Sequence, residues 1–214
     1  MILLIGGEKG GTGKTTIATN LAVQRTKFSK EVLLIDSDKQ MTATYWCSVR
    51  EENGVEPRIT SVQKYGKSLK TEAEILSEKY QDIIIDAGGR DAPELRAALL
   101  VADMVVIPLR PSQFDLWTLS KINDLVEEVS ALNEKLQAFV LLNQSSAHPS
   151  VKESEEAKEL LLDFDNLKLM KSILCERIAF RKAAIKGESV IEASPLDEKA
   201  AKEMDSVYRE IYSI

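Results

Sequence analysis

Short runs of consecutive hydrophobic residues recur along the chain, with longer polar stretches between them. Continuous rather than alternating hydrophobic runs are typical of strands that are covered on both faces. The predicted strands are the runs that begin at Ile2, Val32, Asp82, Asp103, Ala138 and Leu167. We therefore expect a sheet that lies between two covering layers.

The stretches between these runs have the spacing of amphipathic helices, as in residues 15–26 and 94–101. The longest example, residues 116–132, carries Leu116, Leu119, Ile122, Val126, Val129 and Leu132. Strands that alternate with helices predict an α/β fold with a mostly parallel, twisted sheet flanked by helices. No linker or repeat interrupts the series, so residues 1–214 are predicted to form one domain, with residues 143–150 as a loop after a strand.

Composition and charge narrow the classes of function. The chain is 44% hydrophobic and 29% charged, which is typical of a soluble globular protein. Its net charge of -6 gives no overall attraction to nucleic acid or to an anionic membrane, so any such binding requires a local patch. The first hydrophobic run is too short for a signal peptide, which predicts a cytoplasmic protein. Cys47 and Cys175 lack a CxxC neighbour and are predicted to be reduced thiols.

A glycine-rich segment, GGEKGGTGKTT at residues 6–16, follows the first predicted strand and opens a helix. Such loops bind phosphate through backbone N–H groups, and the helix N-terminus adds partial positive charge. Lys14 is predicted to bridge the β- and γ-phosphates of ATP, and the Thr15 hydroxyl to bind Mg²⁺. The predicted phosphate-binding residues are Gly10, Gly11, Thr12, Gly13, Lys14 and Thr15. The usual G-x-x-x-x-G-K-[ST] pattern fails at one position, where Glu8 replaces the first glycine.

Carboxylates end two other predicted strands. Asp86 closes the run DIIID and is placed to hold Mg²⁺, with a structural strand-end cap as the alternative. Asp36 and Asp38 lie two residues apart, so an extended backbone points both to the same side. One would support the magnesium shell and the other would orient the attacking water.

Together these segments resemble the deviant Walker-A ATPases of the ParA/MinD family, and most of all the small, ParF-like partition proteins. The resemblance rests on residues 9–16, 36–40, 83–89, 105–116 and 187–192. It implies a P-loop NTPase three-layer sandwich that hydrolyses ATP with Mg²⁺. Lys39 departs from the family pattern, because many relatives have proline there.

The resemblance also assigns a role to the second lysine of the loop. Lys14 serves its own nucleotide, whereas Lys9 is similar to the lysine that reaches the partner's phosphates in an ATP-dependent nucleotide-sandwich homodimer. A cation supplied in this way acts like an arginine finger. The alternative is a solvated lysine beside the loop.

Further roles follow from the same resemblance. Thr16 would contact the α-phosphate, and Asn143 the adenine. Asp36 would belong to the metal shell, and Asp38 would polarise the hydrolytic water.

A local basic patch occurs in residues 176–186. Its four basic residues, Arg177, Arg181, Lys182 and Lys186, oppose a single acid. Arg181, Lys182 and Lys186 are predicted to bind DNA phosphates without reading sequence, with a solvated helix face as the alternative. Residues 197–214 hold five acids and three bases, so membrane binding is not expected.

The resemblance therefore implies a cytoplasmic, nucleoid-associated ATPase that partitions or positions a plasmid, a chromosome region or a protein cargo. A ParB-like or equivalent adaptor would stimulate hydrolysis. Two alternatives remain open: a metabolic P-loop enzyme of the dethiobiotin synthetase kind, and an ATP-gated scaffold whose hydrolysis is vestigial.

Overall fold

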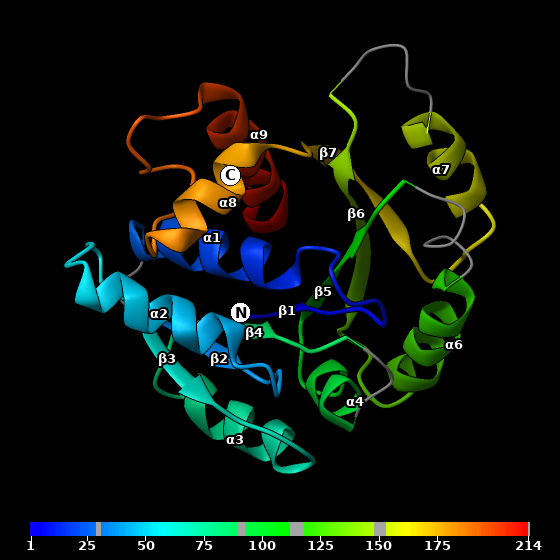
Figure 1. Ribbon diagram of the computed structural model, residues 1–214. Helices are drawn as coiled ribbons and strands as arrows, with labels where there is room; N and C mark the ends of the chain where they lie inside the picture. Colours follow the sequence, from blue (N-terminus) through cyan, green and yellow to red (C-terminus); the bar gives the residue numbers. More distant parts are fainter. Residues whose placement is uncertain (29–30, 90–92, 112–117, 148–152, 214) are drawn as a thin grey trace.

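A parallel β-sheet runs through the middle of the molecule (Figure 1). The computed structural model describes residues 1–28, 31–89, 93–111, 118–147 and 153–213. Among these residues the sheet has seven strands in the order β3-β2-β4-β1-β5-β6-β7, and every neighbouring pair is parallel. The strands are β1 Ile2–Ile5, β2 Val32–Asp36, β3 Thr60–Gln63, β4 Asp82–Asp86, β5 Met104–Leu109, β6 Gln137–Ser145 and β7 Lys168–Cys175.

Helices cover both faces of this sheet, which confirms the predicted three-layer α/β fold (Figure 1). One layer contains α1 Lys14–Thr26, α2 Thr42–Glu52, α8 Ile178–Ile185 and α9 Glu198–Tyr212. The other contains α3 Ser68–Ser77, α4 Pro93–Leu99, α6 Leu119–Ser130 and α7 Glu153–Leu161. Two hydrophobic clusters fill the space between the layers and the sheet because β1, β2 and β4 are buried on both faces.

The sequence prediction needs three corrections. β3 was not predicted, because its residues TSVQ form a short, partly exposed edge strand without a hydrophobic run. The predicted loop 143–150 begins too early, since β6 continues through Ser145. Of the predicted helix 116–132, α6 covers Leu119–Ser130, and residues 116–117 lie outside the described part of the chain.

The acidic residues of α9 are used within the fold. Glu210 accepts hydrogen bonds from the backbone N–H groups of Lys171 and Ser172, at 2.7 and 2.8 Å. Glu203 accepts one from the N–H of Cys175, at 3.1 Å. These carboxylates satisfy donors on the edge strand β7, where an unpaired strand would otherwise be open to another chain. Within the described residues no helix has the length and hydrophobicity that a membrane span requires.

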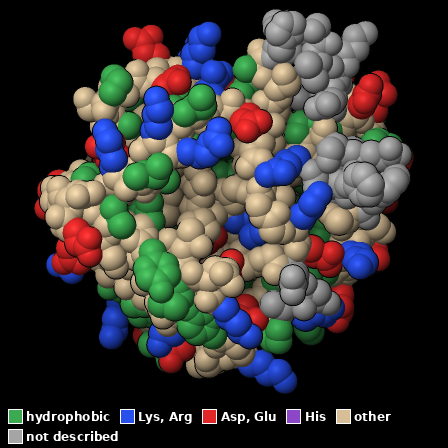
Figure 2. Space-filling model, viewed as in Figure 1, with side chains coloured by type: hydrophobic (Ala, Val, Ile, Leu, Met, Phe, Trp, Pro, Cys, Tyr) green, Lys and Arg blue, Asp and Glu red, His purple; other side chains and the backbone are tan. Residues whose placement is uncertain are grey.

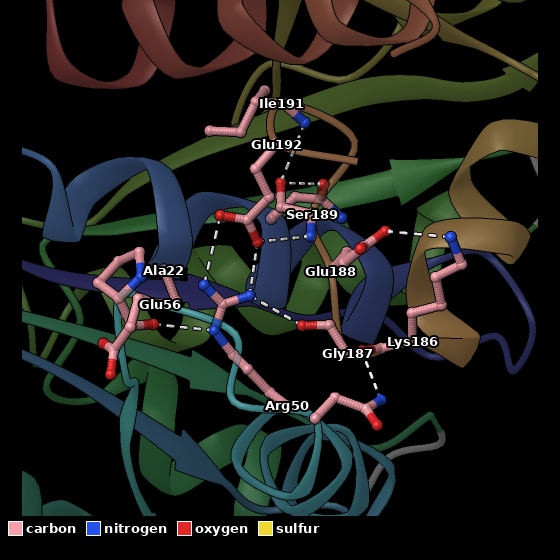
Figure 3. Close-up of polar contacts among 12 residues, drawn as sticks. Ala22, Arg50, Glu56, Lys186, Gly187, Glu188, Ser189, Ile191 and Glu192 are labelled. Atoms are coloured by element: carbon pink, nitrogen blue, oxygen red, sulfur yellow. Dashed lines mark hydrogen bonds and ion pairs between the residues drawn. The ribbon is translucent and has the colours of Figure 1, made fainter. Parts of the chain in front are cut away.

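A buried ion pair joins α2 to the loop before α9 (Figure 3). The Arg50 guanidinium contacts the Glu192 carboxylate at 2.5 Å and also donates to the backbone oxygens of Pro57 and Gly187, each at 2.8 Å. Its side chain is only 2% exposed. Gly187 has a φ of +69°, and a Cβ there would lie 2.4 Å from the Arg50 backbone nitrogen. The two segments are therefore tightly joined.

We predict that Glu192→Ala lowers the free energy of unfolding by about 3 kcal/mol, because it leaves the Arg50 charge buried without its carboxylate. Glu51→Ala removes the partner of the exposed Arg58 and serves as the control, with a loss of about 0.5 kcal/mol. Urea denaturation of both variants checks this. Equal losses would show that the Arg50–Glu192 pair has no special structural role.

Candidate functional site

A glycine-rich loop connects β1 to α1 at the carboxyl ends of the central strands, where parallel sheets place their ligands. Gly11 and Gly13 have φ values of +76° and +91°, which favour glycine. At Gly13 a side chain is also sterically excluded, because a Cβ would lie 2.3 Å from the Asn143 amide nitrogen. The loop thus keeps the backbone open for a ligand in the way that the sequence predicted.

The Lys14 side chain folds over this loop. Its Nζ donates to the backbone oxygen of Lys9 at 2.7 Å, and the residue is buried. Burial lowers the pKa of Lys14, although Asp86 and Asp38 favour its charged form. A cation held in this way can transfer from the loop carbonyl to a phosphate group.

Thr15 and Asp86 form the polar centre of the site. The Thr15 hydroxyl donates to Asp86 Oδ2 at 2.7 Å, so the first turn of α1 meets the end of β4. Burial raises the pKa of Asp86 to about 7, while the hydrogen bond from Thr15 acts in the opposite direction. The other carboxylate oxygen, Oδ1, is buried and has no hydrogen-bond partner in the described structure.

These two oxygen-bearing side chains fit Mg²⁺. It prefers hard oxygen ligands and usually takes only one or two groups from the protein, with phosphates and waters completing its shell. The buried Asp86 Oδ1 lacks the partner that such an ion or its water would supply. In the described residues no group of three or more metal-ligating side chains occurs.

Asp36 has a structural role that the sequence did not reveal. It is fully buried beside Asp86 in the register of β2 and β4. Its Oδ2 accepts from both the N–H and the hydroxyl of Thr44, each at 2.8 Å, and its Oδ1 accepts from the Asp38 N–H at 3.1 Å. Asp36 therefore holds the start of α2, and its place in the metal shell stays a prediction.

Asp38 lies at the opening of the site. It lines a hollow of about 670 Å³ together with Gly10, Gly88 and Gly89. A Cβ on Gly89 would come within 2.9 Å of the Gly10 backbone nitrogen, so the segment after β4 touches the phosphate loop. Asp38 is thus positioned beside the loop, and its action on a water stays a prediction.

Asn143 contacts the phosphate loop directly, since its amide donates to the Thr12 backbone oxygen at 2.6 Å. A cavity of about 280 Å³ lies next to it and is lined also by Thr16 and Arg181. The nucleotide-binding roles of Asn143 and Thr16 stay predictions. The same arrangement places Arg181, which was predicted to bind DNA, at the edge of the nucleotide cavity.

The basic patch is smaller than its sequence suggested. Arg177 is paired with Glu203 at 2.5 Å, so its charge is compensated within the fold. Lys182 and Lys186 are exposed, and Lys186 Nζ contacts the Ser194 backbone oxygen at 3.2 Å. Over α8, Lys and Arg side chains lie beside hydrophobic ones (Figure 2). Ile178 and Ile185 of this helix are exposed. The α8 surface thus combines charge with apolar area.

Several residues at the site were missed because they are distant in sequence. Arg110 and Gln144, at the ends of β5 and β6, both donate to the Gly11 backbone oxygen, at 2.8 and 3.2 Å. Arg110 lies within residues 105–116, one of the segments that carry the family resemblance, but no role was predicted for either residue from the sequence. Lys9 is partly buried, and its role across a dimer stays a prediction.

Comparison with known proteins finds a matching family and several relatives. Residues 3–190 match the model of the CobQ/CobB/MinD/ParA nucleotide binding domain. The chain is 22% identical over 210 residues to the maintenance of carboxysome distribution protein A of Halothiobacillus neapolitanus, covering 98% of this chain and 95% of that protein. It is 29% identical over 167 residues to the chromosome-partitioning ATPase Soj of Thermus thermophilus, covering 65% and 67%.

The fold is also similar to that of a solved ATP complex of a McdA variant from Cyanothece. The TM-score is 0.81 at 18% sequence identity, and the alignment covers 100% of this chain and 96% of the other. At this identity the match establishes the fold.

The raised pKa of Asp86 predicts how stability depends on pH in the absence of metal and nucleotide. The folded protein keeps the Asp86 proton up to pH of about 7, whereas the unfolded chain loses it near pH 4. The contribution of Asp86 to stability is therefore present below pH 4 and is lost as the pH rises towards 7. Relative to Asp86→Asn, the wild type should lose about 1.4 kcal/mol per pH unit in this window.

Urea denaturation of both proteins in EDTA at pH 5, 6, 7 and 8 measures this difference. The asparagine keeps an acceptor for Thr15 but cannot ionise, so it isolates the titration. A stability difference that does not change with pH would contradict the assignment.

Proposed function

Because the chain belongs to the CobQ/CobB/MinD/ParA nucleotide-binding domain family, we propose that it is an ATPase that converts ATP to ADP and phosphate in order to position or partition a large cargo. The observation that supports this most is the cluster of Lys14, Thr15 and Asp86 at the phosphate loop. It combines a buried cation, a hydroxyl and a buried carboxylate where a magnesium–triphosphate group would lie.

Each group would have a separate task. The loop amides and Lys14 bind the phosphates, and Thr15 with Asp86 holds Mg²⁺. The bound ion neutralises charge on the transferring phosphoryl group. Asp38 would orient the attacking water, Thr16 would contact the α-phosphate and Asn143 the adenine.

We further propose that ATP brings two copies of the chain together. Lys9 lies on the phosphate loop, is partly buried and precedes the exposed Gly10. A lysine from the partner would stabilise charge that develops during hydrolysis. The family resemblance supports this sandwich arrangement, in which nucleotide state controls assembly.

The dimer would attach to DNA through the exposed Lys182 and Lys186, with two copies of each lysine in one assembly. Binding would involve phosphates only, and so would be independent of sequence and sensitive to salt. The names of the relatives, a chromosome-partitioning ATPase and a carboxysome distribution protein, indicate the kind of cargo. A ParB-like or equivalent adaptor would stimulate hydrolysis and release the ATPase from the nucleoid in the cytoplasm.

Lys9→Ala tests the dimer mechanism. ATP binding should persist, because Lys14 uses the Lys9 backbone oxygen, which the substitution keeps. We expect loss of ATP-dependent dimerisation and a fall in ATP turnover of roughly a hundredfold. Sedimentation velocity and phosphate release, with and without ATP, check both effects. Unchanged dimerisation and turnover would remove the main support for this mechanism, whereas dimerisation without any hydrolysis in the wild type would favour a scaffold.

Lys182→Glu combined with Lys186→Glu tests the DNA surface. DNA retention in the presence of ATP should weaken by at least about tenfold, while ATP affinity stays as in the wild type. Lys79→Glu with Lys121→Glu is the control, since it makes the same charge change at exposed positions of the opposite helical layer. Biosensor binding to duplex DNA over a salt series measures retention. Equal loss in both double variants would mean that only net charge matters.

A further inference from the structure

Side chains donate hydrogen bonds to three backbone oxygens of the phosphate loop. Lys14 donates to the Lys9 oxygen at 2.7 Å, and Asn143 donates to the Thr12 oxygen at 2.6 Å. Between these two, the Gly11 oxygen accepts from Arg110 at 2.8 Å and from Gln144 at 3.2 Å. The Gly11 oxygen is thus the point where two distant strand ends meet the loop.

These contacts control where the loop amides point. In a planar trans peptide the C=O and the following N–H point in opposite directions. A donor that fixes the Gly11 oxygen on one side therefore fixes the Thr12 N–H on the other. Because Gly11 is in the left-handed region and is exposed, little else in its surroundings restrains this peptide. The hydrogen bonds from Arg110 and Gln144 therefore restrain the orientation of the Gly11–Thr12 peptide.

Arg110 is the stronger of the two donors. It has the shorter contact, and a charged donor gives a stronger hydrogen bond than a neutral amide. It also lines the 280 Å³ cavity beside Asn143, so its charge lies close to the place of a bound nucleotide. Gln144 makes its contact from a backbone φ of +56°, an uncommon value for a residue other than glycine.

We propose that Arg110 is a positioning residue for nucleotide binding: it acts through the Gly11 oxygen to orient the Thr12 N–H towards the phosphates, and Gln144 supports it. This inference rests on the proposed ATP binding. Arg110 works before the reaction, by preorganising the loop, so its removal should weaken ground-state binding of ATP rather than the chemical step.

The test is titration of the full chain with fluorescent mant-ATP and Mg²⁺. Arg110→Ala should raise the Kd roughly threefold to tenfold, as for one lost charge-assisted hydrogen bond. Arg110→Lys keeps a charged donor and should stay within about twofold of the wild type. In steady-state hydrolysis KM should rise with kcat nearly constant. The melting temperature of the nucleotide-free protein should not change, because Arg110 is exposed.

Two further variants sharpen the result. Gln144→Asn shortens the second donor while suiting the positive φ, and together with Arg110→Ala it should weaken binding by more than the product of the single effects. Arg58→Ala removes another exposed arginine, which precedes the start of β3 at the other edge of the sheet, and this variant should bind as the wild type.

Two outcomes would overturn the inference. One is wild-type affinity in Arg110→Ala, and the other is a weakening that Arg58→Ala shares. Failure of the wild type itself to bind mant-ATP would instead contradict the proposed function.

Discussion

The site depends on one physical constraint: a carboxylate is buried at the end of a central strand with only half of its hydrogen-bonding capacity satisfied. Asp86 is held by the Thr15 hydroxyl through one oxygen, while the other has no partner in the described residues. Burial raises the free energy of the charged form of Asp86, and this cost raises the pKa of the carboxyl group. A cation beside Oδ1 would offset that cost, which supports the proposed binding of magnesium together with a nucleotide.

From this centre a continuous set of contacts leads to the outer surface. Asp36, beside Asp86 in the sheet, holds the start of α2 through Thr44. Further along α2, Arg50 is buried against Glu192 and the Gly187 backbone, next to the end of α8. Helix α2 therefore connects the proposed nucleotide site to the proposed DNA surface on α8. Coupling between the two sites would require α2 to adopt two positions. Separating α2 from the loop before α9 would be unfavourable, because it would leave the buried Arg50 charge without its Glu192 partner.

Local features of the sequence predicted the strands and the phosphate loop well, because long hydrophobic runs and the GKT segment carry their own physical meaning. β3 escaped prediction since a short edge strand buries little hydrophobic area. The pairing of Arg177 with Glu203 and the placement of Arg181 at the nucleotide cavity depend on how α8 packs against distant elements. The contacts of Arg110 and Gln144 with Gly11 require β5 beside β1 and β6 beside β5, an order that only the assembled sheet determines.

The proton balance of nucleotide binding tests the central claim most directly. Isothermal titration of MgATP at pH 6.5, in buffers of different ionisation enthalpy, counts the protons released when Asp86 receives a cation. We expect release of more than about half a proton, because a group with a pKa of about 7 is mostly protonated at that pH, and the release should vanish in Asp86→Asn. MgATP binding without proton release in the wild type would show that Asp86 does not meet the metal.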